Sequence, residues 1–129
     1  MLTEPDPPGW IVFTIPPPPS ANNLYANVPG KGRVKTTLYR IWANSAGWQV
    51  RQQFGTLPHY DGFVYLDIDL PRGMDIDNGQ KACFDLLQTP KGRRLKHGLG
   101  IIVDDKMIDE LHIRRVPADR PFTVRLRAA

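Results

Sequence analysis

Residues 63–70 (FVYLDIDL) alternate regularly between apolar and polar side chains. Val64, Leu66 and Ile68 share one parity, whereas Asp67 and Asp69 share the other. Because successive side chains of a strand point to opposite faces, this period predicts a strand with one buried face and one wetter face. The apolar side of such a strand must be covered by other elements, so this segment limits the folds that the chain can adopt.

Two further segments are predicted to form helices. The first should run from Thr36 or Thr37, either of which can cap a helix N-terminus, to about residue 54. The second should cover residues 77–87, and Asp77 with Gln80 resembles a capping box at its start. The side chains expected to face inward are Leu38, Ile41, Trp42, Ser45 and Trp48 on the first helix, and Ala82, Cys83 and Leu86 on the second. Trp42 and Trp48 are thus interpreted as core residues rather than as a platform for base stacking.

The remaining strands are predicted near the two ends of the chain. Residues 10–15 (WIVFTI) favour a strand that the prolines at 16–19 stop, and residues 16–35 are expected to form a long ordered loop. Residues 101–103 predict a short buried strand, and residues 107–116 and 122–127 a closing hairpin. The expected fold class is α+β, with residues 1–129 forming a single domain that has a mixed sheet of about four to five strands and two main helices. Residues 1–9 are expected to be a flexible tail and residues 90–100 a basic loop.

The charge distribution points to a polyanionic partner. Seventeen Lys and Arg residues against thirteen Asp and Glu residues give a net charge of +4. The basic residues occur in groups, which suits a nucleic-acid backbone, although a solvated surface would also account for charge runs of this kind. The residues that we expect to contact DNA are Lys31, Arg33, Lys35, Arg93, Arg94 and Lys96.

Several other function classes lack their sequence signals. A lone Cys83 permits no internal disulfide and fits a reducing compartment. No apolar run approaches the roughly 20 residues of a membrane span, and the N-terminal residues show no secretory signal. A P-loop, a GxSxG motif and histidines at metal-ligand spacing are all missing from the sequence. We therefore expect a soluble protein of the cytoplasm of a bacterial or phage-infected cell, with no membrane partner and no small-molecule cofactor.

Two acidic pairs carry the main functional signal. Asp75 and Asp77 lie where a loop becomes a helix, and Asp104 and Asp105 follow the apolar run 101–103. In a basic protein that contacts phosphates, carboxylates are useful when a divalent cation lies between them, and hard oxygen ligands select Mg²⁺ or Mn²⁺. Such an ion can activate water and stabilise a phosphodiester under attack, so the pattern indicates a metal-dependent nuclease. Helix capping by the first pair and a simple turn at the second remain the alternative explanation.

Three segments of the chain resemble the RusA family of Holliday junction resolvases. Residues 15–25 (IPPPPSANNLY) are similar to the N-terminal strand and Pro-Pro-Ser-x-Asn-Asn loop of that family. Residues 75–87 (DIDNGQKACFDLL) resemble its D-[LI]-D-N-x-x-K-x-x-x-D-x-L core, and residues 103–108 (VDDKMI) resemble its D-D-x-x-[VI] segment. In order and approximate spacing, these matches extend over most of residues 10–127. Residues 90–100 are longer than the connection expected in the family.

The resemblance implies a Mg²⁺-dependent endonuclease that acts as a homodimer on four-way DNA junctions, in recombination and repair or in phage DNA processing. Asp75, Asp77 and Asp105 match the catalytic carboxylates of the family, Lys81 matches its important lysine, and Asp104 matches the neighbouring acid. The hypothesis is that the carboxylates bind Mg²⁺, for which Mn²⁺ would substitute, and that Lys81 neutralises a phosphate oxygen. Asn78 is a candidate for orienting a carboxylate or a water molecule. A broader nuclease of branched or flap DNA and a non-catalytic basic DNA-binding protein remain alternatives.

Overall fold

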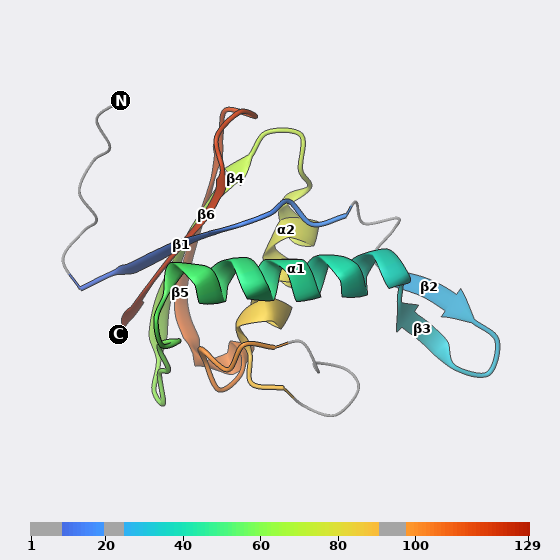
Figure 1. Cartoon of the computed structure of the whole chain (residues 1–129), viewed down its shortest axis with the longest axis horizontal. Helices are drawn as coiled ribbons and strands as arrows, with labels where there is room; N and C mark the ends of the chain where they lie inside the picture. The colour runs from blue at the N-terminus through green and yellow to red at the C-terminus, as the bar shows by residue number, and fades with distance from the viewer. Residues whose placement is uncertain (1–8, 20–24, 91–97) are drawn as a thin grey trace.

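The computed structural model describes residues 9–19, 25–90 and 98–129, and for residues 25–27 and 32–35 it describes the backbone alone. The elements follow one another along the chain as Figure 1 shows. They are β1 (Ile11–Ile15), β2 (Tyr25–Val28), β3 (Gly32–Lys35), α1 (Thr37–Gln53), β4 (Val64–Pro71), α2 (Ile76–Leu87), a short 3₁₀ helix η2 (Asp105–Met107), β5 (Ile108–Val116) and β6 (Phe122–Ala128).

β4 is paired on both sides within a four-stranded mixed sheet of order β1-β6-β4-β5. It runs antiparallel to β6 and parallel to β5, and β1 runs antiparallel to β6. This arrangement confirms the expected α+β class with a mixed sheet and two helices. The predicted closing hairpin is wrong, because β4 lies between β5 and β6 and residues 117–121 connect two strands that are not neighbours. Insertion of β4 gives its buried side chains flanking strands on both sides.

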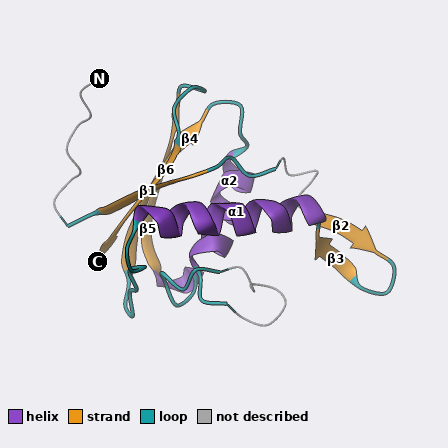
Figure 2. Ribbon diagram, in the orientation of Figure 1, coloured by secondary structure: helices purple, strands orange, loops and turns teal. Residues whose placement is uncertain are grey.

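One face of the sheet forms the core with the two helices. Val64, Leu66, Ile68 and Leu70 of β4 are fully buried, which confirms the face that their alternation predicts. Both helices lie on this same side of the sheet, and no helix of the described residues covers the other side (Figure 2). The fold is therefore a two-layer structure with one sheet face left open in the described part of the chain.

α1 begins as expected but faces the core with a different row of side chains. Thr36 caps the helix, and its hydroxyl oxygen accepts from the backbone N–H of Tyr39 at 3.2 Å. Trp42 is buried, as predicted, whereas Leu38, Ile41 and Trp48 are 54%, 62% and 60% exposed, and Ser45 is exposed as well. The buried residues of the helix are Tyr39, Trp42, Ala43, Ala46, Gly47 and Val50. The prediction for Leu38, Ile41 and Trp48 is wrong because the small residues at 43, 46 and 47 let this side of the helix approach the sheet closely.

α2 begins one residue earlier than predicted, at Ile76, and Asp75 rather than Asp77 is its N-cap. Ala82, Cys83 and Leu86 are buried, as their spacing predicts. The first turn of the helix lies very close to β4. A Cβ atom on Gly79 would stand 2.7 Å from Cδ1 of Leu70, so glycine at this position permits the contact between helix and strand.

Two loop regions contain more, or less, regular structure than expected. Residues 25–35, predicted as part of a loop, form the β2–β3 hairpin, in which Gly30 takes a positive φ of 77° at the turn. Residues 101 and 102 are buried, as predicted, but Ile102 makes isolated bridges to Tyr60 and Gln88 instead of forming a strand. Val103 is exposed. No helix in the described part of the chain is long and apolar enough to cross a membrane.

The side chain of Gln53, at the end of α1, closes part of the outer edge of β1. Its Nε2 donates to the carbonyl oxygen of Thr14 at 2.8 Å, and the Thr14 N–H donates to its Oε1 at 2.8 Å. The amide therefore imitates a neighbouring strand, and it ties the helix to a strand whose edge would otherwise offer unpaired backbone groups.

We expect Gln53→Glu to destabilise the fold by about 1 kcal/mol, because a carboxylate cannot donate to the Thr14 carbonyl. Gln52→Glu is the matched control, since it places the same charge in the same exposed helical turn away from β1. Urea unfolding followed by circular dichroism measures both variants. Equal destabilisation of the two variants would contradict a stabilising role of the Gln53–Thr14 hydrogen bonds and would leave only the effect of the added charge.

Candidate functional site

Asp75 and Asp77 lie at the end of the sheet where β4 finishes. Pro71, the last residue of β4, pairs with Val116, and a tight turn over residues 72–74 leads to Asp75. As the N-cap of α2, Asp75 accepts from the backbone N–H of Asn78 through Oδ1 at 3.2 Å. Asp77 lies in the first turn of the helix, and both carboxylates are exposed to solvent. The helix dipole favours negative charge at this position.

Asp104 and Asp105 lie at the opposite end of the sheet. They directly precede β5, whose first residue, Ile108, pairs with Val64 at the start of β4. Oδ1 of Asp104 accepts from the backbone N–H of Lys106 at 2.8 Å and so caps the short η2 helix. Asp105 occupies the first position of that helix and is exposed.

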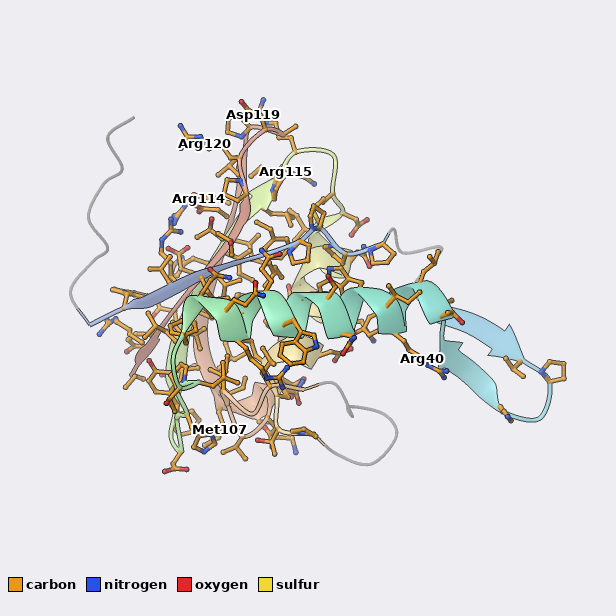
Figure 3. The ribbon with its side chains drawn as sticks, in the orientation of Figure 1. Arg40, Met107, Arg114, Arg115, Asp119 and Arg120 are labelled. Carbon is orange, nitrogen blue, oxygen red and sulfur yellow. The ribbon has the colours of Figure 1, made fainter. Side chains whose placement is uncertain are left out.

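One chain therefore keeps the two acidic pairs apart. The eight residues of β4 separate them by about 25 Å at the usual rise of a strand. In Figure 3, Met107, which follows this second pair, and Arg115, which contacts the segment before Asp75, lie at opposite ends of the sheet. No group of three His, Cys, Asp or Glu side chains within the described ranges could hold a metal ion. Mg²⁺ requires oxygen ligands at about 2.0–2.1 Å, so Asp75, Asp77 and Asp105 of a single chain do not form a site that fits it.

Asn78 and Lys81 lie on the same helix as the first acidic pair. Asn78 is 7% exposed, and its Nδ2 donates to the carbonyl oxygen of Pro19 at 2.8 Å. Asn78 thus joins the end of the proline segment to the N-cap of α2 and holds Asp75 through its own backbone N–H. Lys81 is exposed one turn beyond Asp77. Its position at the helix start is consistent with an interaction with an anion near this pair.

Arg115 joins this end of the molecule, although the sequence pattern did not single it out. It lies near the end of β5, and its Nη1 donates to the carbonyl oxygen of Met74 at 2.8 Å. The contact fixes the connection between β4 and α2 immediately before Asp75. The sequence around Arg115 contains no motif that would predict its contact with Met74.

Asp85, the last acidic residue of the central motif, has a structural contact. Its Oδ2 accepts from the hydroxyl group of Tyr39 at 3.0 Å, and Tyr39 is buried on α1. This hydrogen bond joins the two helices. Asp85 therefore belongs to the packing of the helix layer rather than to the exposed acidic pair at the start of α2.

The residues expected to contact DNA fall into three groups. Lys31 lies exposed in the turn between β2 and β3, and this hairpin extends beyond the N-terminal end of α1 (Figure 1). The backbone of Arg33 and Lys35 belongs to β3. Arg93, Arg94 and Lys96 lie outside the described residues. A two-stranded ribbon of this kind fits the width of a DNA major groove.

Asp67 and Asp69 form ion pairs on the open face of the sheet. Arg114 donates to Asp67 at 2.6 Å and to Asp69 at 2.9 Å. Arg125 of β6 donates to Asp69 at 2.9 Å. Both aspartates are therefore neutralised by arginines from the two neighbouring strands, and they are poor candidates for a metal site. Arg127 on the same face lies over the rings of Trp10 and Tyr65.

Cys83 offers no nucleophile. It is buried beneath α2, and burial raises the pKa of its thiol to about 12. The thiolate that nucleophilic chemistry requires is therefore not populated near neutral pH.

No protein-family model matches this chain, and a search of the curated proteins finds no match.

Asp75→Ala should destabilise the fold by about 1 kcal/mol, because the substitution removes the N-cap of α2. Asp75→Asn should leave stability nearly unchanged, since asparagine is an equally good cap. Asp77→Ala should have the smaller effect of losing one charge in the first turn. Thermal and urea unfolding of the three variants measure the difference, and a larger loss for Asp77→Ala than for Asp75→Ala would contradict the assignment of the cap.

His59 should make stability pH-dependent near the second acidic pair. Its Nδ1 lies 2.6 Å from the Gly100 carbonyl and its Nε2 2.9 Å from Asp61, and both ring nitrogens can donate only in the cation. The Gly100 carbonyl and then the Asp61 carboxylate raise the pKa of His59 above its ordinary 6.5.

A raised folded-state pKa means that the stabilisation is present below pH 6.5 and is lost as pH rises through the folded-state value. Unfolding in urea between pH 5.5 and 8.5 should therefore show a loss in the wild type that His59→Gln lacks. Asp61→Asn is the companion variant, because it removes the carboxylate contact and keeps the Gly100 contact, and it should retain part of this loss. If stability in His59→Gln depends on pH as it does in the wild type, His59 is not the cause of the pH dependence.

Proposed function

We propose that the chain is a divalent-metal-dependent endonuclease of branched DNA that acts as a homodimer, with four-way junctions as its main substrate. The observation that carries the proposal is the placement of two acidic pairs, with Asp75, Asp77 and Asp105 exposed, at the two ends of adjacent strands. Asp75 and Asp77 follow β4, and Asp105 precedes β5. The resemblance of these segments to the RusA family supports the same function, and it supplies the expectation of a dimer.

Because the two acidic pairs are far apart within one chain, a dimer has to bring the first pair of one copy close to the second pair of the other. A two-fold axis brings the surface of one copy against the same surface of the other in the reverse direction. Asp75 and Asp77 of one copy can thereby lie beside Asp105 of the second copy, and the symmetry gives two such sites. Each site would then contain three carboxylates, which one chain by itself does not assemble. Mg²⁺ held there would supply a water molecule of lowered pKa and positive charge next to the scissile phosphate.

The groups around the first pair suit a phosphate. Lys81 and Arg115 place positive charge on the side of Asp75 and Asp77, and the N-terminus of α2 adds the positive end of its dipole. Lys31 and the backbone of β3 extend the DNA-binding surface along the hairpin. Two opposed sites on a symmetric dimer match the approximate two-fold symmetry of a four-way junction, so paired incision is the expected outcome.

A complementation experiment tests the shared sites. Asp75→Asn/Asp77→Asn protein and Asp105→Asn protein should each be inactive alone. After subunit exchange, a heterodimer with shared sites keeps one site with all three native carboxylates. Random exchange makes about half of the dimers mixed, and each mixed dimer has one intact site out of two. Nicking should therefore return to roughly a quarter of the wild-type rate.

The substrates for this assay are end-labelled four-way junction, flap and linear duplex, each with Mg²⁺ or EDTA. Asp119→Asn, an exposed change in the turn between β5 and β6, is the charge-matched control and should cleave as the wild type does. If the mixture of the two inactive variants stays inactive, while the wild type cleaves, the sites are not shared between copies. Cleavage of flaps without paired junction incision would favour the broader nuclease, and binding without any Mg²⁺-dependent nick would favour a DNA-binding protein.

A further inference from the structure

The outer edge of β5 is open among the described residues. β5 stands at one end of the sheet, and β4 is the one strand with which it pairs. Its nine residues make it the longest strand described. Ile108, Leu111 and Ile113 pack against the core but remain only partly buried. A long strand with unpaired backbone groups and half-covered apolar side chains is a template for another strand.

The sequence of β5, IDELHIRRV, is complementary to itself when it is reversed about His112. In an antiparallel pair centred there, Glu110 lies opposite Arg114 of the partner subunit, and Leu111 lies opposite the partner's Ile113. Asp109 and Arg115 of the partner subunit form a further pair of opposite charges. Every position apart from the central His112 is thus matched by charge or by apolar character, and two-fold symmetry makes each of these matches twice. His112 lies on the axis, and its Nε2 is 2.6 Å from Oε1 of Glu110 in the same chain.

The regular part of the strand is sufficient for this pairing. Val64 pairs with Ile108 and Tyr65 with Glu110, so Asp109 is the extra residue of a bulge. Residues 110–114 lie beyond the bulge in unbroken register with β4. They contain the central histidine, the Leu–Ile match and the Glu–Arg match. Arg114 keeps its ion pairs to Asp67 and Asp69 on the open face, while its side chain is half exposed at this edge.

We infer that β5 is the surface through which two copies of this chain associate, as antiparallel neighbours centred on His112. The two sheets then join into one continuous sheet. This inference deepens the proposed function and rests on it for its catalytic consequence. The start of β5 then lies next to the end of the partner's β5, and the partner's β4 is the next strand of the joined sheet. The partner's β4 leads to the partner's Asp75. Asp105, which precedes β5, is therefore two strand spacings, or about 10 Å, from that strand.

The exposed apolar row of α1 is the competing surface for a second copy. Leu38, Ile41 and Trp48 form it, and Arg40 and Arg51 flank it. No Asp or Glu occurs between residues 7 and 60, so two such helices would bring positive charge together without any compensating acid. β5 carries both signs of charge in matched positions. Charge complementarity therefore favours the strand edge.

Cysteine cross-linking tests the central position of the pairing. His112 is the one residue of β5 that would lie opposite its own copy, where Cβ atoms of directly opposed residues are about 4.5–5.5 Å apart. His112→Cys should form a covalent dimer with oxidised glutathione. Arg120→Cys, in the exposed turn after β5, is the control and should remain monomeric on a non-reducing gel. Cys83 does not compete, because it is buried and its pKa is raised to about 12.

A charge reversal tests the same edge without a cross-link. Glu110→Arg would face Arg114 of the partner subunit at two symmetric positions, so the dimer should dissociate at a protein concentration at least tenfold higher than for the wild type. Asp119→Arg makes the same change of charge away from the edge and should leave the dimer intact. Sedimentation velocity over a concentration series measures all three proteins, and circular dichroism confirms that each is folded.

Two results would overturn the inference. One is the absence of a His112→Cys cross-link together with an unchanged dimer in Glu110→Arg. The other is a dimer that Trp48→Ala disrupts and Glu110→Arg does not, which would assign the interface to α1. These outcomes are independent of catalysis, because a protein that cross-links at position 112 but never nicks DNA would contradict only the proposed nuclease function. A protein that nicks and complements, but shows neither this cross-link nor a weaker dimer in Glu110→Arg, would contradict only the interface.

Discussion

The double-sided pairing of β4 is the constraint on which the rest of the structure depends. β4 pairs with β6 on one side and with β5 on the other, and its four inward side chains are fully buried. Since β5 runs parallel to β4, the chain between them must return along the sheet, and α2 makes that return. The two connections of such a unit necessarily lie at opposite ends of its strands. The acidic pairs occupy those two connections, so the topology itself separates them.

The two faces of the sheet have different kinds of stabilisation. The helix side is closed by apolar packing, and Gly79 brings the first turn of α2 against Leu70. On the open side, Asp67 and Asp69 are held by Arg114 and Arg125, so cross-strand ion pairs take the place of a second layer. Ion pairs that are partly shielded from water also fix the register of three neighbouring strands, because each arginine has to reach a particular carboxylate.

Local patterns predicted the elements better than their arrangement. The alternation of residues 63–70 identified β4 and its buried face, because burial of one face imposes a period of two. On α1 the pattern failed, since Leu38, Ile41 and Trp48 form one apolar row and Tyr39, Trp42 and Val50 form another. The choice between them depends on Ala43, Ala46 and Gly47, whose small size matters only once the helix meets the sheet. Strand order was not predictable either, because a five-residue link between β5 and β6 is equally compatible with a hairpin and with a crossing over the end of β4.

For the site, the sequence motif identified which carboxylates lie exposed at element boundaries, but not their distance from one another. That distance depends on strand order, which no local signal at Asp75 or Asp105 encodes. Arg115 was overlooked for the same reason, since its contact with Met74 joins residues 41 positions apart. Asp85 was grouped with the acidic motif, whereas its hydrogen bond to Tyr39 gives it a place in the packing of the two helices.

The position of β6 has a consequence for how the protein forms during translation. β6 follows every other described element in the sequence, yet it lies between β1 and β4. Until it emerges, the nascent polypeptide presents two strands without their shared neighbour, and the sheet stays in separate pieces. Assembly is thus postponed to a late, long-range step, which is slow and leaves apolar strands open to misassociation with other molecules.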